Sequence, residues 1–330
     1  MIKYKGKTSG LLKAFKISIG LILLGIVAFL GFEFIPGFFK SGTGSPSSSK
    51  DVVDLSPDQY QIKSVNLLGL DKIIETSHFS IYFHSGNEDE ARQLITICEN
   101  DYPSLSKFFE STPKTEVLLT YDADEYVNVF NAAPPWAGAD RYKDPKTSAG
   151  SFCPSCTKSL KNETEYIYML RPGMKSFAHE ISHRYYWSNY KNLRFNNDLT
   201  WLNEGLAVYV QNEIAKGPGG LSSTSLPNIK KFTLPESFSE LNQLQQTGST
   251  DMFYDLVGLM AYYISDRSSD PGLKKFIDDL NQTKDLDKTS QKILNMNSNQ
   301  LFTGWKENVE KVAAGNPKDF LTSFRSQTQK

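Results

Sequence analysis

Hydrophobic residues between positions 78 and 313 alternate at a few places and recur every three or four positions over longer segments. Phe79, Ile81 and Phe83 alternate with polar residues, which is typical of a half-buried strand over 78–84. Two further strands are predicted at 116–121 and 166–170. Helical spacing predicts helices over 88–110, 123–130, 174–190, 199–214, 254–267, 272–280, 290–295 and 302–313. A small sheet with a helical portion behind it predicts an α+β domain.

Two of the predicted helices combine a clear apolar stripe with clear boundaries. A Pro-Gly pair precedes the helix at 174–190, in which Phe177, Ile181 and Tyr185 recur at a spacing of four. The helix at 199–214 carries a similar stripe and ends before a Gly-Pro pair, which is a strong stop signal. Both helices are therefore expected to be core elements.

These two helices carry the chemically most informative residues. His179 and His183 are two of only four histidines in the chain, and residues four apart project from the same face of a helix. Two imidazoles at this spacing can bind one metal ion, with Glu180 placed between them to act on a water molecule. Glu204 lies on the second, apolar helix, where an unpaired carboxylate is costly to bury, so a metal ion is its natural partner. Three protein ligands and an open fourth position predict a catalytic zinc site, because a structural zinc is closed by a fourth protein ligand.

The HExxH motif at 179–183 and the Trp-Leu-Asn-Glu-Gly-Leu-Ala run at 201–207 resemble the gluzincin clan of zinc peptidases, in particular the peptidase MA-like domain family. Residues 76–83 resemble the opening strand of such domains, and Trp305 matches a tryptophan in their closing helix. The resemblance covers roughly residues 76–310. It implies a zincin-like fold with one zinc ion per chain, bound by the two histidines and Glu204.

The resemblance also implies an activity, the hydrolysis of peptide bonds with Glu180 as general base. Residues 253–258 resemble a helix start at which relatives place a tyrosine that stabilises the transition state, so Tyr254 is the candidate hydrogen-bond donor. A tyrosine beside a phenylalanine at a helix start is also commonly a packing residue, and both roles stay open for Tyr254. The nearest match to the Gly-Ala-Met-Glu-Asn strand of aminopeptidases, residues 148–151, lacks the glutamate. Endopeptidase action on an exposed protein or peptide is therefore at least as well supported as aminopeptidase action.

The substrate and the cleft are less well defined by the sequence. The resemblance suggests that a strand upstream of the motif pairs with the extended substrate, either 149–152 or 165–170. Residues 218–250 are rich in Ser, Pro and Gln, and we expect them to loop around the cleft. A membrane-tethered binding module that keeps the zincin fold without turnover is the alternative function, and a non-peptide hydrolysis at the same site is also open. Glu180 argues against the binding module, because this residue is needed for catalysis and not for metal binding.

The first residues of the chain predict an attachment to the lipid bilayer. Residues 1–16 contain five lysines and no acid, and residues 17–39 are almost entirely apolar apart from Glu33. A spanning helix needs about 20 residues, which this segment supplies, and the lysine excess places its amino end in the cytoplasm. A cleaved signal peptide is the alternative, although no Ala-x-Ala type of cleavage site follows the apolar run. The sequence thus predicts a single-pass cell-membrane protein with an extracytoplasmic catalytic domain.

The remaining boundaries follow from composition. Residues 40–75 are predicted to be a linker and polar lead-in, with a Ser- and Gly-rich tether at 41–49, and residues 76–330 are predicted to form the peptidase domain. The net charge of −1 and the lack of a basic stripe in the sequence argue against a nucleic-acid partner. Cys153 and Cys156 are expected to form a small disulfide, with free thiols as the alternative, whereas Cys98 is expected to be buried.

Overall fold

The computed structural model describes residues 55–56, 58–121, 166–170, 177–193, 196–215, 229, 231–245, 250–268, 272–315 and 319–329. All of them lie in the unit that spans Val52–Lys330. The predicted membrane anchor and tether, the helix predicted at 123–130 and the Cys153/Cys156 pair lie outside the described residues. Within the described part of the chain, no helix has the length and apolar character needed to cross a membrane.

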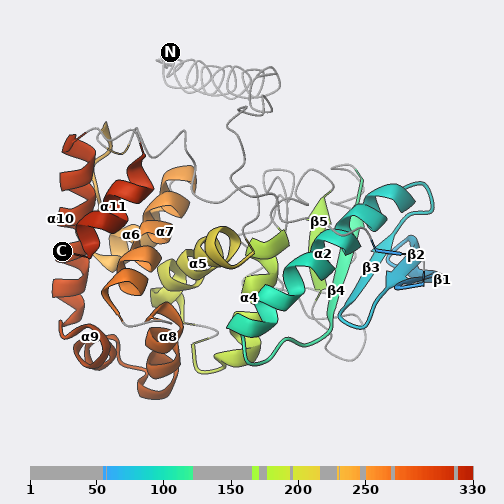
Figure 1. The fold of residues 1–330 in the computed structure, drawn as a ribbon, viewed down its shortest axis with the longest axis horizontal. Helices are drawn as coiled ribbons and strands as arrows, with labels where there is room; N and C mark the ends of the chain where they lie inside the picture. The colour runs from blue at the N-terminus through green and yellow to red at the C-terminus, as the bar shows by residue number, and fades with distance from the viewer. Residues whose placement is uncertain are drawn as a thin grey trace, which may run out of the picture. The chain divides into compact units, whose positions relative to one another are not determined.

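A five-stranded sheet with the order β1-β2-β3-β4-β5 forms one layer of the fold (Figure 1). Its strands are β1 (Gln61–Leu67), β2 (Leu70–Glu75), β3 (Phe79–Phe83), β4 (Thr115–Thr120) and β5 (Tyr166–Leu170). The pairs β1/β2 and β2/β3 are antiparallel, whereas β3/β4 and β4/β5 are parallel. The three strands predicted from the sequence are confirmed as β3, β4 and β5.

The first two strands lie in the segment predicted to be a polar lead-in. They form a hairpin in which Leu67 pairs with Leu70 across the two residues Leu68 and Gly69. Both of these residues have positive φ, 56° and 90°, which matches the twist of a tight hairpin turn. These two strands, which extend the sheet, were not predicted from the sequence.

The helices are α2 (Glu88–Phe108), α4 (Phe177–Asn189), α5 (Thr200–Tyr209), α6 (Phe238–Leu244), α7 (Thr250–Arg267), α8 (Gly272–Thr283), α9 (Leu286–Leu294), α10 (Ser298–Gly315) and α11 (Phe320–Thr328). A 3-10 turn, η5 (Asn197–Leu199), leads into α5, and a π-helical turn, η6 (Val210–Ile214), continues it. These elements confirm an α+β fold with a helical portion behind the sheet. The long helix predicted at 199–214 is thus one continuous element of three helical types.

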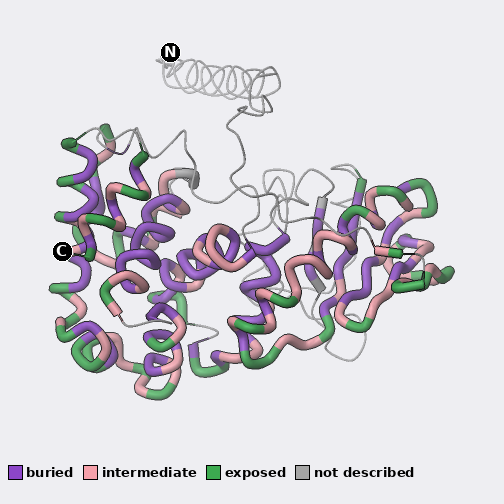
Figure 2. The backbone as a smooth tube through the Cα atoms, in the orientation of Figure 1, coloured by how far each residue is buried: buried purple, intermediate pink, exposed green. Residues whose placement is uncertain are grey.

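The helices α4 and α5 lie between the sheet and the helical portion in Figure 1. The helix α2 packs on β2, β3 and α4, while α5 packs on α4 and more extensively on α7. The predicted stripe of α4, Phe177, Ile181 and Tyr185, is fully buried. Figure 2 shows the same burial along α4, α5 and α7. The two helices that carry the metal motif are therefore central elements of the core.

Two helices occur where none was predicted. The helix α6 lies within 218–250, which was expected to loop, and α11 lies at the carboxyl end of the chain. Each begins at a side-chain cap: the Ser237 hydroxyl accepts from the Glu240 N–H at 3.2 Å, and the Asp319 carboxylate accepts from the Thr322 N–H at 3.0 Å.

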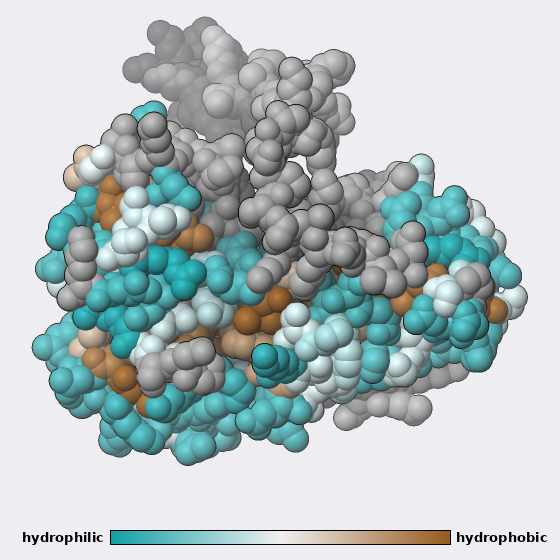
Figure 3. All heavy atoms as spheres, in the orientation of Figure 1, coloured by the Kyte–Doolittle hydropathy of each residue, from teal (hydrophilic) through white to brown (hydrophobic). Residues whose placement is uncertain are grey.

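The described surface is mainly hydrophilic on the face drawn in Figure 3, and Tyr121 is the one large hydrophobic residue that the described segments leave exposed.

Candidate metal centre

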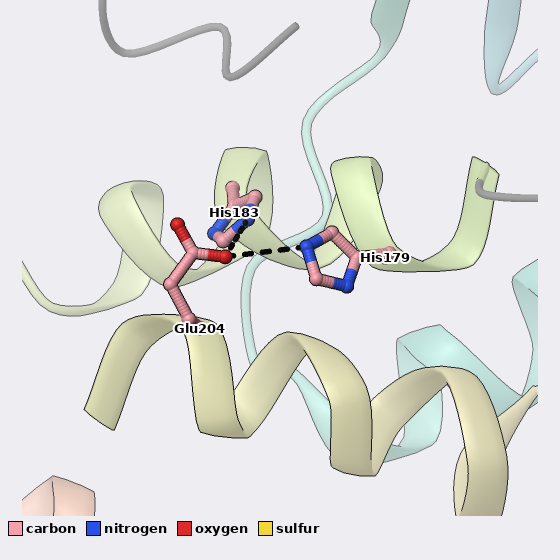
Figure 4. Close-up of side chains that lie close together, drawn as sticks. All are labelled: His179, His183 and Glu204. Atoms are coloured by element: carbon pink, nitrogen blue, oxygen red, sulfur yellow. Dashed lines mark ion pairs between the residues drawn. The ribbon is translucent and has the colours of Figure 1, made fainter. Parts of the chain in front are cut away.

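The helical period of α4 brings His179 and His183 onto one face, as the sequence predicted. Both imidazoles are buried, with 9% and 2% of the residue surface exposed, and their ring centroids lie 4.9 Å apart. Figure 4 shows both rings on α4 turned toward Glu204, which comes from the neighbouring helix α5. The structure therefore brings together the three residues that were predicted as metal ligands.

The carboxylate of Glu204 meets both imidazoles through a single oxygen. Its Oε2 lies 3.3 Å from Nε2 of His179 and 3.4 Å from Nε2 of His183. One ligand atom from each of the three residues lies within 4.8 Å of the others. These three buried groups can hold a metal ion.

The surroundings of Glu204 support this interpretation. The Glu204 residue is 8% exposed, and among the described residues no donor makes a hydrogen bond of good geometry to its Oε2. A buried carboxylate oxygen without a donor is destabilising unless a cation compensates it. A divalent cation at this point satisfies the oxygen and accepts both imidazoles, so the donor set fits a metal ion.

The electrostatics of the group lead to the same conclusion. Burial is the largest single influence on the pKa of His183 and lowers it. The charge and hydrogen bond of Glu204, with smaller contributions from Glu180 and Asn203, together outweigh burial and raise that pKa to about 9. Burial alone raises the pKa of Glu204, but the charge of His183 and the proximity of both imidazoles hold it well below its usual range. Without a metal ion, a proton on the imidazole supplies the positive charge that this buried carboxylate requires.

Neighbouring side chains hold the imidazole of His183 in place. Asn203 Oδ1 lies 3.1 Å from Nδ1 of His183, so Nδ1 carries the proton and the neutral ring keeps its lone pair on Nε2, facing Glu204. Trp187 stacks on this ring, with centroids 5.5 Å apart and planes at 18°. Asn203 and Trp187 were not singled out from the sequence. The position of Asn203 immediately before the glutamate was the available signal, and Trp187 follows His183 by one helical turn.

The position of α5 depends on Gly205, the residue after Glu204. A Cβ atom at Gly205 would lie 2.5 Å from the carbonyl oxygen of Val257 on α7. Only glycine allows the two backbones to approach this closely. The glycine of the Asn-Glu-Gly run therefore has a packing role that sets the distance between α5 and α7.

The two predicted catalytic residues lie beside the three ligands. Glu180 is on α4 between the two histidines, is 8% exposed, and is near enough for its charge to contribute to the raised pKa of His183. Tyr254 is near the start of α7, and its ring meets that of His179 edge to face with centroids 5.5 Å apart. The structure places both residues close to the metal site.

Other residues considered from the sequence have structural partners away from this site. His78 lies 2.8 Å from the Glu99 carboxylate and stacks on Tyr102, and His84 lies 3.4 Å from Asp71; these two histidines flank the strand β3. Cys98 is fully buried, as expected. Four further aromatic residues are also buried: Tyr185, Tyr186, Tyr263 and Trp305.

No known protein-family model matches this chain, and no curated protein matches it in sequence. Membership of the gluzincin clan therefore stays a prediction from the motif residues. The geometry of His179, His183, Glu204 and Glu180 is therefore the main indication of what the protein does.

Proposed function

We propose that this protein is a membrane-anchored, extracytoplasmic zinc metallopeptidase. The observation that carries the proposal is the convergence of His179, His183 and Glu204 on one point, with both imidazoles within 3.4 Å of the same buried Glu204 oxygen and with Glu180 beside them. Two histidines and one glutamate are the ligand set of several catalytic zinc sites. The membrane location rests on the apolar segment at 17–39 and its lysine-rich flank.

Each side chain has a distinct role in the proposed reaction. His179, His183 and Glu204 would hold the zinc ion, which, when bound, lowers the pKa of water and polarises a carbonyl group. Glu180 takes a proton from the attacking water and delivers it to the leaving amine. Tyr254 donates a hydrogen bond to the oxyanion that develops on the peptide carbonyl. The position of Tyr254 against His179 supports this role.

The substrate is proposed to be an exposed protein or peptide. The strand β5 pairs with β4 along one edge, and among the described strands none pairs with its other edge. An extended peptide added to such an edge gains backbone hydrogen bonds. The other candidate strand, 149–152, lies outside the described residues.

The first test is the metal content of the purified full-length protein. We expect about one zinc ion per chain, and loss of that zinc in Glu204→Ala. Glu307→Ala is the matched control, because it removes the same group from an exposed position on α10. A protein that binds no zinc under any condition of metal loading contradicts the proposal.

The second test separates a peptidase from a silent binding module. Glu180→Gln should keep zinc and lose peptide hydrolysis, because the amide cannot accept the proton. Turnover comparable to that of the parent would refute the general-base role of Glu180. Full zinc occupancy in a parent that hydrolyses no peptide would instead favour the binding module.

A further inference from the structure

The short helix α6, which was not expected from the sequence, makes contact with the Glu204 helix at two levels. At the beginning of α5, Asn242 Oδ1 accepts a hydrogen bond from the Trp201 N–H at 2.8 Å. The Asn242 amide also donates to the carbonyl oxygens of Asn197 and Asp198, at 3.3 and 3.0 Å. Phe238 of α6 stacks on Trp201 with centroids 4.5 Å apart. These contacts fix the amino end of α5, which lies one turn before Glu204.

The second contact reaches the ligand itself. Gln245, directly after α6, donates from Nε2 to Oε1 of Glu204 at 3.3 Å. The two oxygens of this carboxylate thus have different neighbours: Oε1 receives the Gln245 amide, and Oε2 lies toward the two imidazoles. The hydrogen bond from Gln245 therefore makes the two oxygens of the Glu204 carboxylate, which are otherwise equivalent, different from each other.

This asymmetry matters because a carboxylate at the end of a glutamate side chain rotates easily. The terminal torsion of glutamate has broad and shallow minima, so packing alone does not choose which oxygen faces the imidazoles. A hydrogen bond to one oxygen restricts the rotation and leaves the other oxygen free for a metal ion. Removing a hydrogen-bond partner of a metal ligand usually weakens metal binding by about 10- to 100-fold.

We propose that Gln245 is a positioning residue for the metal site, which holds Glu204 with Oε2 directed at His179 and His183. This inference rests on the proposed zinc site. It adds a residue that lies 41 positions from Glu204 in the sequence and belongs to neither motif helix. Gln245, within the region 218–250, thus contributes to the metal centre through the Glu204 oxygen that does not face the imidazoles.

The test compares zinc affinities of the full-length protein and of two variants, measured by competition with a chelator. Gln245→Met keeps the length of the side chain and removes the amide, and we expect zinc binding to weaken by roughly 10-fold or more. Gln243→Met is the matched control: it makes the same change two positions away on α6, where Gln243 is exposed, and should change the affinity less than about twofold. Gln245→Asn, which is one methylene too short, replaces Gln245→Met if the latter does not fold, with the same expected loss.

Cobalt(II) provides a readout that a purely structural role would not affect. Its visible absorption depends on ligand geometry, so Gln245→Met should change the spectrum of the cobalt-loaded protein while its melting temperature stays close to that of the parent. Equal zinc affinity and equal cobalt spectra in the parent and in Gln245→Met would refute the positioning role and leave the zinc site intact. A parent that binds neither metal would overturn the zinc site itself and, with it, this inference.

Discussion

Replacing Gly205 with alanine tests whether the close approach of α5 to α7 is what holds Glu204 in place. The new Cβ would lie 2.5 Å from the Val257 carbonyl oxygen and 3.1 Å from its carbon, well inside the 3.4 Å at which ordinary van der Waals contact begins. Both atoms belong to the backbone of α7, and Val257 is fully buried. The clash can therefore be relieved only by moving one helix away from the other.

The size of the effect follows from two opposing contributions. Overpacking in a core costs about 1–3 kcal/mol, and a clash with backbone belongs at the upper end of that range. Alanine in place of glycine within a helix contributes about 1 kcal/mol in the stabilising direction. The net expectation for Gly205→Ala is a destabilisation of about 2 kcal/mol, or a fall of about 4–8 °C in melting temperature.

The assay is thermal unfolding of the metal-free protein together with its zinc affinity. Because Glu204 precedes Gly205, a shift of α5 should also weaken zinc binding, by roughly 10-fold if it resembles the loss of a supporting contact. Gly315→Ala is the control, since a Cβ at Gly315, the last residue of α10, meets no atom within 4 Å. If Gly205→Ala melts at the temperature of the parent or of Gly315→Ala and binds zinc equally well, the close approach at Gly205 does not hold Glu204 in place.

Three further predictions concern other parts of the molecule. Tyr254→Phe should keep zinc and lower turnover about 10²- to 10³-fold if the hydroxyl stabilises the oxyanion; steady-state kinetics that match the parent would assign Tyr254 to packing. Arg325→Met should lower the free energy of unfolding by roughly 1.5–3 kcal/mol, because it removes both 2.9 Å bonds from Arg325 to the buried carboxylate of Asp266; urea denaturation that shows no loss would contradict this role. Hydrogen bonds from the Ser85 hydroxyl and N–H lower the pKa of Asp71 to about 2. The stabilisation by Asp71 is therefore fully present above its usual pKa of 3.8 and is lost as the pH falls through about 2. The difference in melting temperature between the parent and Asp71→Asn should be larger at pH 6 than at pH 3. A difference that grows toward pH 3 would contradict this prediction.

The elements that the sequence predicted correctly are those whose own pattern is strong. The strand β3 alternates around Phe79 and Ile81, and α4 repeats an apolar residue every four positions, so each could be recognised without its neighbours. The hairpin β1/β2 could not, because its turn places Leu68 at positive φ where an Asn-Gly or Asp-Gly pair is the usual signal. Ser237 and Glu240 form a capping-box pattern, which is a signal for the start of α6. The helix itself has only seven residues and is too short to show a helical repeat of apolar positions.

The sequence by itself determined which side chains share the face of α4, because the spacing of His179 and His183 and the period of a helix leave no other arrangement. It also identified Glu204 as a carboxylate on an apolar helix. Only the tertiary structure decided that Glu204 meets both imidazoles through one oxygen, because that depends on how α5 packs against α4. The contacts of Asn203 and Gln245 likewise required the packed helices, since hydrogen bonds between residues 20 and 41 positions apart follow no local pattern. Helical period is a local property of the chain, whereas the orientation of a ligand is set by the contacts between helices.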